Sequence, residues 1–116
     1  MLTRMPDPSA ADRILAAVRE LAAGQVASYG GIARRAGLPG RARMVARVLG
    51  RTEDPALPWH RVLRSDGRIA FPKDSAGYRE QVRRLQAEGV DVREGRVPMA
   101  ASDDLDLTLW GPRRGL

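Results

Sequence analysis

The chain has 116 residues, of which 43% are hydrophobic, and a formal net charge of +6. This length fits one domain with a core of its own. The absence of Cys excludes disulfides, thiolate metal ligands and thiol nucleophiles within the chain. Its single histidine, His60, cannot form a multi-histidine metal site, so we expect neither a metal nor a cofactor.

The hydropathy pattern contains no long apolar run. A membrane-spanning helix needs roughly 18 or more consecutive apolar residues, and the sequence has no such stretch. The first residues also lack the apolar segment of a secretory signal. We therefore expect no membrane association, and the lack of Cys favours the reducing cytoplasm.

The distribution of charge is more informative than its sum. Between Leu21 and Thr52 there is no acidic residue. The same stretch contains six arginines: Arg34, Arg35, Arg41, Arg43, Arg47 and Arg51. A coding bias explains why Lys73 is the only lysine, but it does not explain the missing acids. The block predicts a face that binds a polyanion, most often nucleic acid.

A first helix is predicted over Ala10–Ala23. Ser9 is a suitable N-cap, and Asp12 stands where it can complete a capping box. Apolar residues then recur at helical spacing as far as Ala22. Gly24 is the expected stop.

Two short helices follow, over Tyr29–Ala36 and Gly40–Leu49. Ser28 is a suitable cap for the first of them, and Gly50 is the expected end of the second. We expect Ala42, Val45, Ala46 and Leu49 to face the core, and Arg43, Arg47 and Arg51 to form an exposed stripe. Two helices joined by a short Gly-containing turn, with Arg along the second, are typical of a helix-turn-helix.

The remainder predicts a wing and a closing helix. The β-prone runs His60–Arg64 and Arg68–Phe71 flank an Asp-Gly turn, which favours a small hairpin. Asp74 or Ser75 can cap a last helix, whose buried face carries Tyr78, Val82 and Leu85. We therefore predict a mainly α, winged-helix-like helix-turn-helix DNA-binding domain over residues 1–90. Residues 91–116 are expected to extend the same domain, as a tail that packs back against it through Leu105, Leu107 and Trp110.

Several short motifs resemble the C-terminal DNA-binding domain of O6-alkylguanine-DNA alkyltransferases. In chain order they are Ser28-Tyr29-Gly30, Ile32-Ala33, Gly37-Leu38-Pro39, Ala42-Arg43, Pro58-Trp59-His60-Arg61-Val62 and Leu85 with Glu88-Gly89. The resemblance covers about Ala10 to Val90. It is specific in combination and weak in its separate pieces.

One departure from that family is decisive for chemistry. The reactive motif of the transferases is Pro-Cys-His-Arg, and here Trp59 holds the Cys position. The replacement is similar to alkyltransferase-like proteins, which bind O6-alkylguanine in DNA without transferring the alkyl group. The chain also lacks the Asn-Pro before Pro58, and Phe71-Pro72-Lys73 replaces the Tyr and Gly-rich segment of the transferases.

The resemblance assigns the pocket for the extrahelical base to Trp59, Tyr29, Pro58 and His60, with no catalytic residue. For Trp59 the alternative is a purely core tryptophan. His60 and Glu88 correspond to the pair that activates the thiol in the transferases. With no thiol to activate, we interpret them as a structural hydrogen bond, and a polar contact of His60 to DNA or water is the alternative.

The resemblance also assigns DNA contacts. Arg43 corresponds to the arginine that fills the gap left by the extruded nucleotide, and an ordinary phosphate contact is the alternative. Tyr29 corresponds to a phosphate contact, or is a half-buried core residue. Arg41, Arg47 and Arg51 bind phosphate or remain solvated, and Arg61 binds the backbone or fixes its loop.

These assignments imply a damage sensor that flips O6-alkylguanine out of duplex DNA and flags it for nucleotide excision repair. The bacterial partner implied by the resemblance is UvrA, and we expect the chain to act as a monomer. One rival interpretation is a sequence-specific winged-helix transcriptional regulator that reads base edges in the major groove. Another is a weak alkyltransferase that uses a residue other than Cys.

Overall fold

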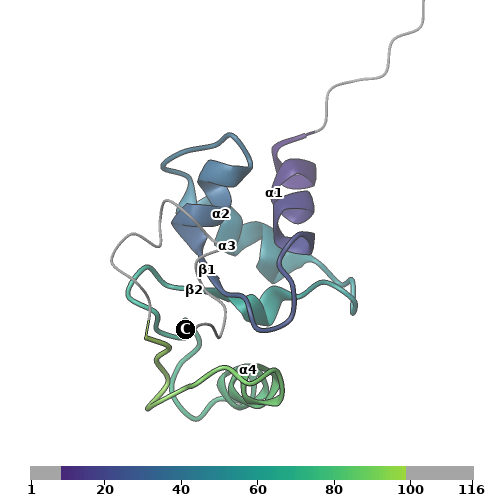
Figure 1. Ribbon diagram of the computed structural model, residues 1–116. Coiled ribbons are helices and arrows are strands. Elements are labelled where there is room, and N and C mark those ends of the chain that lie inside the picture. Colours follow the sequence, from purple (N-terminus) through teal and green to yellow (C-terminus); the bar gives the residue numbers. More distant parts are fainter. Residues whose placement is uncertain (1–8, 99–116) are drawn as a thin grey trace, which may run out of the picture.

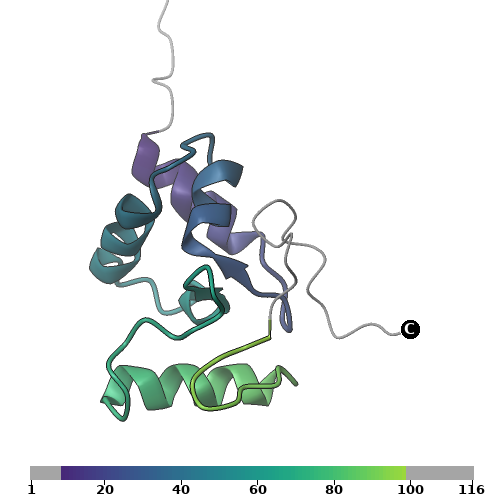
Figure 2. The same ribbon diagram turned by 90° about the vertical axis from the view of Figure 1, so that its left-hand side faces the viewer.

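The computed structural model describes residues 9–98, which contain four α-helices and a short parallel sheet. In chain order the elements are α1 (Ala10–Arg19), β1 (Ala27–Ser28), α2 (Tyr29–Arg35), α3 (Ala42–Arg51), the 3-10 turn η1 (Trp59–Arg61), β2 (Val62–Leu63) and α4 (Ala76–Ala87). Figures 1 and 2 show α1, α2 and α3 gathered together and α4 lying apart from them, and Figure 1 shows the two strands between. The predicted mainly α organisation is therefore observed.

The short sheet separates two hydrophobic clusters. Ala27 pairs with Val62, and both belong to the larger cluster with the buried faces of α1, α2 and α3. The neighbouring Val26 and Leu63 belong to the smaller cluster, together with Leu85 of α4. Because side chains alternate along an extended chain, neighbouring residues such as Val26 and Ala27 face opposite clusters.

Serine caps start three of the helices: Ser9 and Ser28, as predicted, and Ser75, one of the two candidates for the last helix. Ser9 accepts the N–H of Asp12 and completes a capping box with the Asp12 carboxylate. Ser28 and Ser75 accept the N–H groups of Gly31 and Tyr78 in the same way. Such caps satisfy N–H groups that would otherwise have no partner within the helix.

The first helix ends earlier than predicted, at Arg19 instead of Ala23. The N–H of Leu21 bonds to the carbonyl of Val18 at 3.0 Å, which tightens the chain into a turn. The N–H of Ala22 then donates to the Gln25 side chain at 2.8 Å instead of continuing the helical ladder. This turn buries Leu21, and helical periodicity alone does not distinguish it from another helical turn.

The third helix is shifted two residues toward the C-terminus relative to the prediction. Gly40 has a left-handed φ of 82° and Arg41 has a ψ of 40°, so neither begins a helix. At the other end Gly50 stays helical, and the helix ends only where Thr52 becomes extended with ψ 143°. Helical Gly costs about 1 kcal/mol, which the packing of Leu49 against the larger cluster offsets.

The predicted hairpin turn forms, and the Arg64 N–H bonds to the Arg68 carbonyl at 2.9 Å across it, but the two arms do not continue as a paired sheet. The N–H of Gly67 bonds to the carbonyl of Arg64 at 2.8 Å, which closes the turn. The outgoing arm pairs instead with the segment after α4, through bonds of 2.9 Å from Ile69 to Gly95 and from Val97 to Gly67. The incoming arm, β2, pairs in parallel with β1. The expected packing of the tail through Leu105, Leu107 and Trp110 lies outside the described residues.

Candidate nucleic-acid interface

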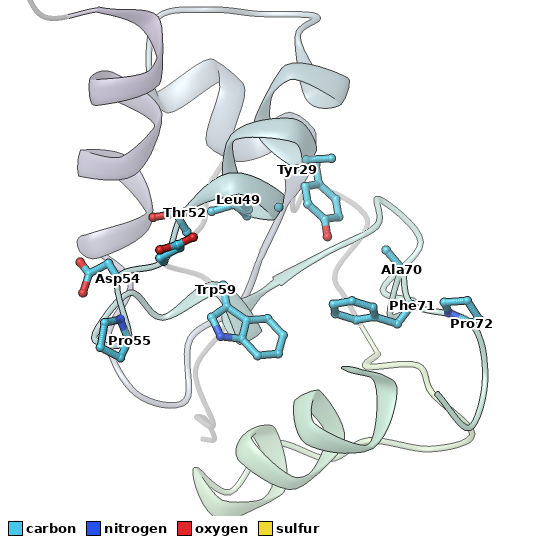
Figure 3. A pocket seen from close by; sticks show the side chains of 12 residues that line it. Tyr29, Leu49, Thr52, Asp54, Pro55, Trp59, Ala70, Phe71 and Pro72 are labelled. Atoms are coloured by element: carbon cyan, nitrogen blue, oxygen red, sulfur yellow. The ribbon is translucent and has the colours of Figure 1, made fainter. Parts of the chain in front are cut away.

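A pocket of about 590 Å³ opens beside the C-terminal half of α3, within the size range of small-molecule sites. It is lined by Tyr29, Ala46, Leu49, Gly50, Thr52, Glu53, Asp54, Pro55, Trp59, Ala70, Phe71 and Pro72. Figure 3 shows Trp59 and Phe71 next to each other at one side of this pocket, with Tyr29 and Leu49 at another. Ala46, predicted to face the core, is exposed and lines the pocket instead.

Trp59 is held in place from three directions. The Phe71 ring meets it edge-on at 5.9 Å, and the His60 ring does so at 6.0 Å. The guanidinium of Arg84 lies over the indole at 5.5 Å, and Glu80 holds that guanidinium through a hydrogen bond of 2.6 Å. Trp59 also packs against the larger core cluster. It is therefore both a core residue and a pre-organised wall of the pocket.

Tyr29 is the first residue of α2 and contributes its half-buried side chain to the same pocket. Burial raises the pKa of its phenol, and the positive charge of Arg64 opposes that increase. The phenol therefore stays neutral at physiological pH and retains a hydroxyl that can donate a hydrogen bond.

Pro58 and His60 do not line the pocket. Both are buried, and His60 is only 6% exposed. Of the four residues that the resemblance places around the flipped base, the structure thus brings Tyr29 and Trp59 together and keeps the other two in the interior. The correction follows from the 3-10 turn η1, which turns the Trp59 ring outward and the His60 ring inward.

Glu88 is the centre of a hydrogen-bond cluster next to η1. Its carboxylate bonds to His60 Nε2 at 2.8 Å and accepts Arg61 Nη2 at 2.6 Å and the Gly24 N–H at 3.0 Å. Arg61 Nη1 donates to the Leu21 carbonyl at 2.8 Å. The cluster ties α4 to η1 and to the turn after α1.

Arg61 is therefore occupied within the protein. Both its Nε and its Nη2 donate to Glu88, and its side chain is 16% exposed. Of the two predicted roles, fixing the loop is the one that the structure displays. The predicted contact of Arg61 with DNA would require breaking these bonds.

The protonation states of the cluster follow from its surroundings. Burial disfavours the charged form of His60 and lowers its pKa, although the hydrogen bond that His60 donates to Glu88 acts in the opposite direction. Burial would raise the pKa of Glu88, but the donors Arg61, Gly24 and His60 together lower it to about 2. At neutral pH a neutral His60 thus donates Nε2–H to an ionised Glu88. His60 Nδ1 is buried and has no partner within the described residues.

A second polar contact fixes the same segment from α4. Gln81 is buried, and its Nε2 donates to the carbonyls of His60 and Val62 at 3.0 and 3.1 Å. The buried amide satisfies carbonyls that the short strand leaves open. Gln81 was missed by the sequence analysis, because one glutamine on a polar helix carries no distinctive pattern.

The predicted arginine stripe lies exposed along α3. Arg43, Arg47 and Arg51 are all exposed, and Arg41 is exposed just before the helix. No acidic residue stands in the first turn of α3. Another member of the acid-free block, Arg35, instead pairs with Glu20 at 2.8 Å. The stripe leaves a positive surface on the helix that also borders the pocket.

Phe71 lines the pocket and Arg84 lies over its Trp59 wall, and the sequence analysis assigned neither of them to the pocket. Phe71 is 42% exposed and lies in a Pro-containing loop, where hydrophobic periodicity gives no signal.

Within residues 9–98 no group of three or more His, Cys, Asp or Glu is placed to hold a metal ion. No helix in the same part of the chain is long and apolar enough to cross a membrane.

The family model for the DNA-binding domain of 6-O-methylguanine DNA methyltransferase matches residues 9–90. A DNA base-flipping protein of Vibrio parahaemolyticus is 40% identical over 75% of this chain and 87% of its own length. Alkyltransferase-like protein 1 of Schizosaccharomyces pombe is 40% identical over 69% of this chain and 75% of its own.

Solved structures agree with these sequence relatives. The crystal structure of S. pombe Atl1 in complex with damaged DNA containing O6-carboxymethylguanine has a TM-score of 0.68 and 31% identity. That alignment covers 95% of this chain and 100% of the Atl1 chain. Mycobacterium tuberculosis OGT in complex with DNA has a TM-score of 0.61 and 28% identity, over 83% of this chain and 55% of OGT.

These comparisons confirm the resemblance and the winged-helix-like fold class that the sequence predicts. The matched residues include the whole helical unit, the pocket wall at Trp59 and the Glu88 cluster. The chain belongs to the family of the 6-O-methylguanine DNA methyltransferase DNA-binding domain.

Proposed function

We propose that the chain recognises O6-alkylguanine in duplex DNA by taking the base out of the helix into the pocket beside Trp59. The observation that carries this proposal is the juxtaposition of that pocket with the arginine stripe of α3. The names of the relatives support it, because one is a DNA base-flipping protein and another is solved with damaged DNA. Flipping costs a few kcal/mol and is least costly at a damaged pair, which contributes to selectivity.

The proposed binding involves no transfer of the alkyl group. The chain has no Cys, and the indole of Trp59 has no nucleophilic atom of use at neutral pH. The retained His60 is neutral and bonded to Glu88, but it has no thiol beside it to deprotonate. The alkylated base would therefore remain chemically unchanged in the complex.

Repair of a lesion that is bound but unchanged requires another enzyme. We therefore extend the proposal to a hand-over to nucleotide excision repair, in which the protein on its extruded base marks the site and UvrA is the bacterial partner. We further propose that one monomer occupies each lesion, since one chain contains both the pocket and the arginine stripe. The cytoplasm, where DNA repair takes place in bacteria, remains the proposed compartment.

The first test compares two duplexes that differ by one methyl group. We expect tighter binding to the duplex with O6-methylguanine than to the same duplex with guanine, by roughly 1–3 kcal/mol or about 5- to 150-fold. The measurement is a binding titration at one fixed salt concentration. Equal affinities, combined with a preference for one undamaged sequence, would instead identify a transcriptional regulator.

The same mixtures test the absence of chemistry. After incubation with methylated DNA, mass spectrometry of the protein should show no added methyl group. An alkylated peptide would contradict the non-covalent proposal and identify the acceptor residue directly.

The arginine stripe predicts a strong dependence of DNA affinity on salt. Four exposed arginines on phosphates release counterions, so log K should fall with log salt at a slope of about −3.6, or more steeply if other residues contribute. The measurement is a titration of undamaged duplex at several salt concentrations. A slope near zero would show that this face of α3 does not meet DNA.

A further inference from the structure

A second cluster of positive charge lies in a groove next to the pocket. The groove has a volume of about 480 Å³. Five of its lining residues are basic: Arg64, Arg68, Lys73, Arg93 and Arg96. Glu94 is the one acidic residue of the lining. None of these residues belongs to the acid-free block between Leu21 and Thr52, so the sequence did not reveal them as a cluster.

The backbone assembles this basic groove from two distant segments. The turn after β2 pairs antiparallel with the chain that follows α4, which sets Arg68 opposite Arg96. Buried Ile69 and Val97 anchor the pairing in the smaller hydrophobic cluster. Like charges directly opposite each other on paired strands destabilise the pairing. An anion bound between them would remove this repulsion.

The acidic neighbours of the groove neutralise only part of its charge. Asp66 lies 3.5 Å from Arg68, and Asp91 lies 3.0 Å from Arg93, both at exposed positions. Arg96 donates to the backbone carbonyl of Asp66 at 2.9 Å, which orients its guanidinium without neutralising it. Within residues 9–98 no ion pair joins Arg64 or Lys73 to a carboxylate. The groove therefore keeps a surplus of positive charge.

The groove and the pocket share a wall. Ala70, Phe71 and Pro72 line both cavities. Arg64 is close enough to Tyr29 of the pocket for its charge to oppose the increase that burial causes in the pKa of that phenol. An extended polyanion that delivers one of its units to the pocket would therefore pass directly beside the groove.

We propose that the basic groove binds backbone phosphates of the DNA strand whose base enters the pocket. The inference rests on the proposed function and extends the DNA contact from α3 to the wing and the segment after α4. Four of the five cations are arginines, whose planar guanidinium groups bind phosphate through paired hydrogen bonds. An acidic protein would also be attracted to a positive surface. Binding of such a protein would not, however, require it to extend along the wall that the groove shares with the pocket.

The test removes two charges that do not hold the fold. Arg64→Gln combined with Arg68→Gln should make the salt slope on undamaged duplex shallower by about 2, close to 0.9 for each lost phosphate contact. Affinity at about 0.1 M salt should fall roughly tenfold or more. The ratio of affinities for lesion and undamaged duplex should change less than about twofold, because phosphate contacts carry no information on the base.

A matched pair controls for net charge. Arg79→Gln combined with Arg83→Gln removes the same charge from the exposed side of α4, outside both the groove and the α3 stripe. This control should leave the slope within about 0.5 of wild type. Unchanged thermal unfolding of both double variants would show that they are folded.

Two results would overturn the groove proposal. One is an unchanged salt slope for DNA binding in the Arg64/Arg68 variant. Loss of binding to an acidic protein, with the DNA slope unchanged, would count as this result. The other is an equal change in both double variants, which would be an effect of net charge. Failure of the wild type to prefer the lesion would instead overturn the proposed function, and the slope comparison on undamaged duplex would still stand.

Discussion

Replacing Glu88 by Ala should lower the free energy of unfolding by about 3 kcal/mol, the typical cost of removing one partner of a largely buried charge pair. The change leaves the Gly24 N–H, the buried His60 Nε2–H and most donors of Arg61 without their acceptor. A chemical denaturation curve at pH 7 measures the loss.

Glu80 provides a matched control on the same helix. Its pKa is also lowered to about 2, by hydrogen bonds from Arg83 and Arg84. Its side chain is 33% exposed, however, against 15% for Glu88, so water screens its interactions. Glu80→Ala should therefore change stability little. Equal losses in the two variants would contradict the view that the Glu88 cluster holds the fold.

The same cluster predicts how stability depends on pH. Both His60 and Glu88 have folded-state pKa values below their unfolded ones, so the unfolded chain binds more protons on acidification. The contribution of His60 is fully present above about pH 6.5 and is lost as pH falls through its lowered folded pKa. The contribution of Glu88 is present above about pH 4.3 and is lost as pH falls through about 2. In the Glu88→Ala variant the loss between pH 5 and 2 should be smaller than in the wild type.

The sequence predicted most of what local chemistry determines. Serine caps at Ser9, Ser28 and Ser75 satisfy N–H groups a few residues away, so short motifs sufficed to locate three helix starts. The exposed stripe of Arg43, Arg47 and Arg51 followed from helical periodicity alone. Motif identity, not periodicity, led to Trp59 and to the pairing of His60 with Glu88.

The features that the sequence did not predict depend on contacts between distant segments. Beyond its closing turn, the outgoing arm of the expected hairpin pairs through residues 67–69 with residues 95–97, and no local pattern marks this pairing. The same pairing creates the basic groove. Its arginines alternate with acidic residues along the chain, so a count of charges along the sequence does not reveal them as a cluster. Phe71 and Gln81 act through neighbours more than ten residues away. The outward turn of Trp59 against the inward turn of His60 required the geometry of η1.

Arg43→Ala should reduce the preference for lesion DNA while affecting undamaged DNA much less. Arg43 lies on the same face of α3 as Ala46 and Gly50, which line the pocket, because residues three and seven apart share a helix face. This position fits the proposed role of Arg43 in filling the gap left by an extruded base, a gap that arises only in the flipped complex. The loss of preference should be about 1–3 kcal/mol, by analogy with stacking contacts to bases.

Arg47→Ala is the matched control for the Arg43 variant, since it removes the same exposed side chain one turn further along α3. As a phosphate contact it should weaken binding to both duplexes about equally and make the salt slope shallower by roughly 0.9. The measurement is the ratio of affinities for O6-methylguanine and guanine duplexes in each variant at one salt concentration. If Arg43→Ala lowers both affinities in parallel and leaves that ratio at the wild-type value, Arg43 is a phosphate contact. Selectivity would then reside in the walls of the pocket, with Trp59 and Phe71 as the next residues to replace.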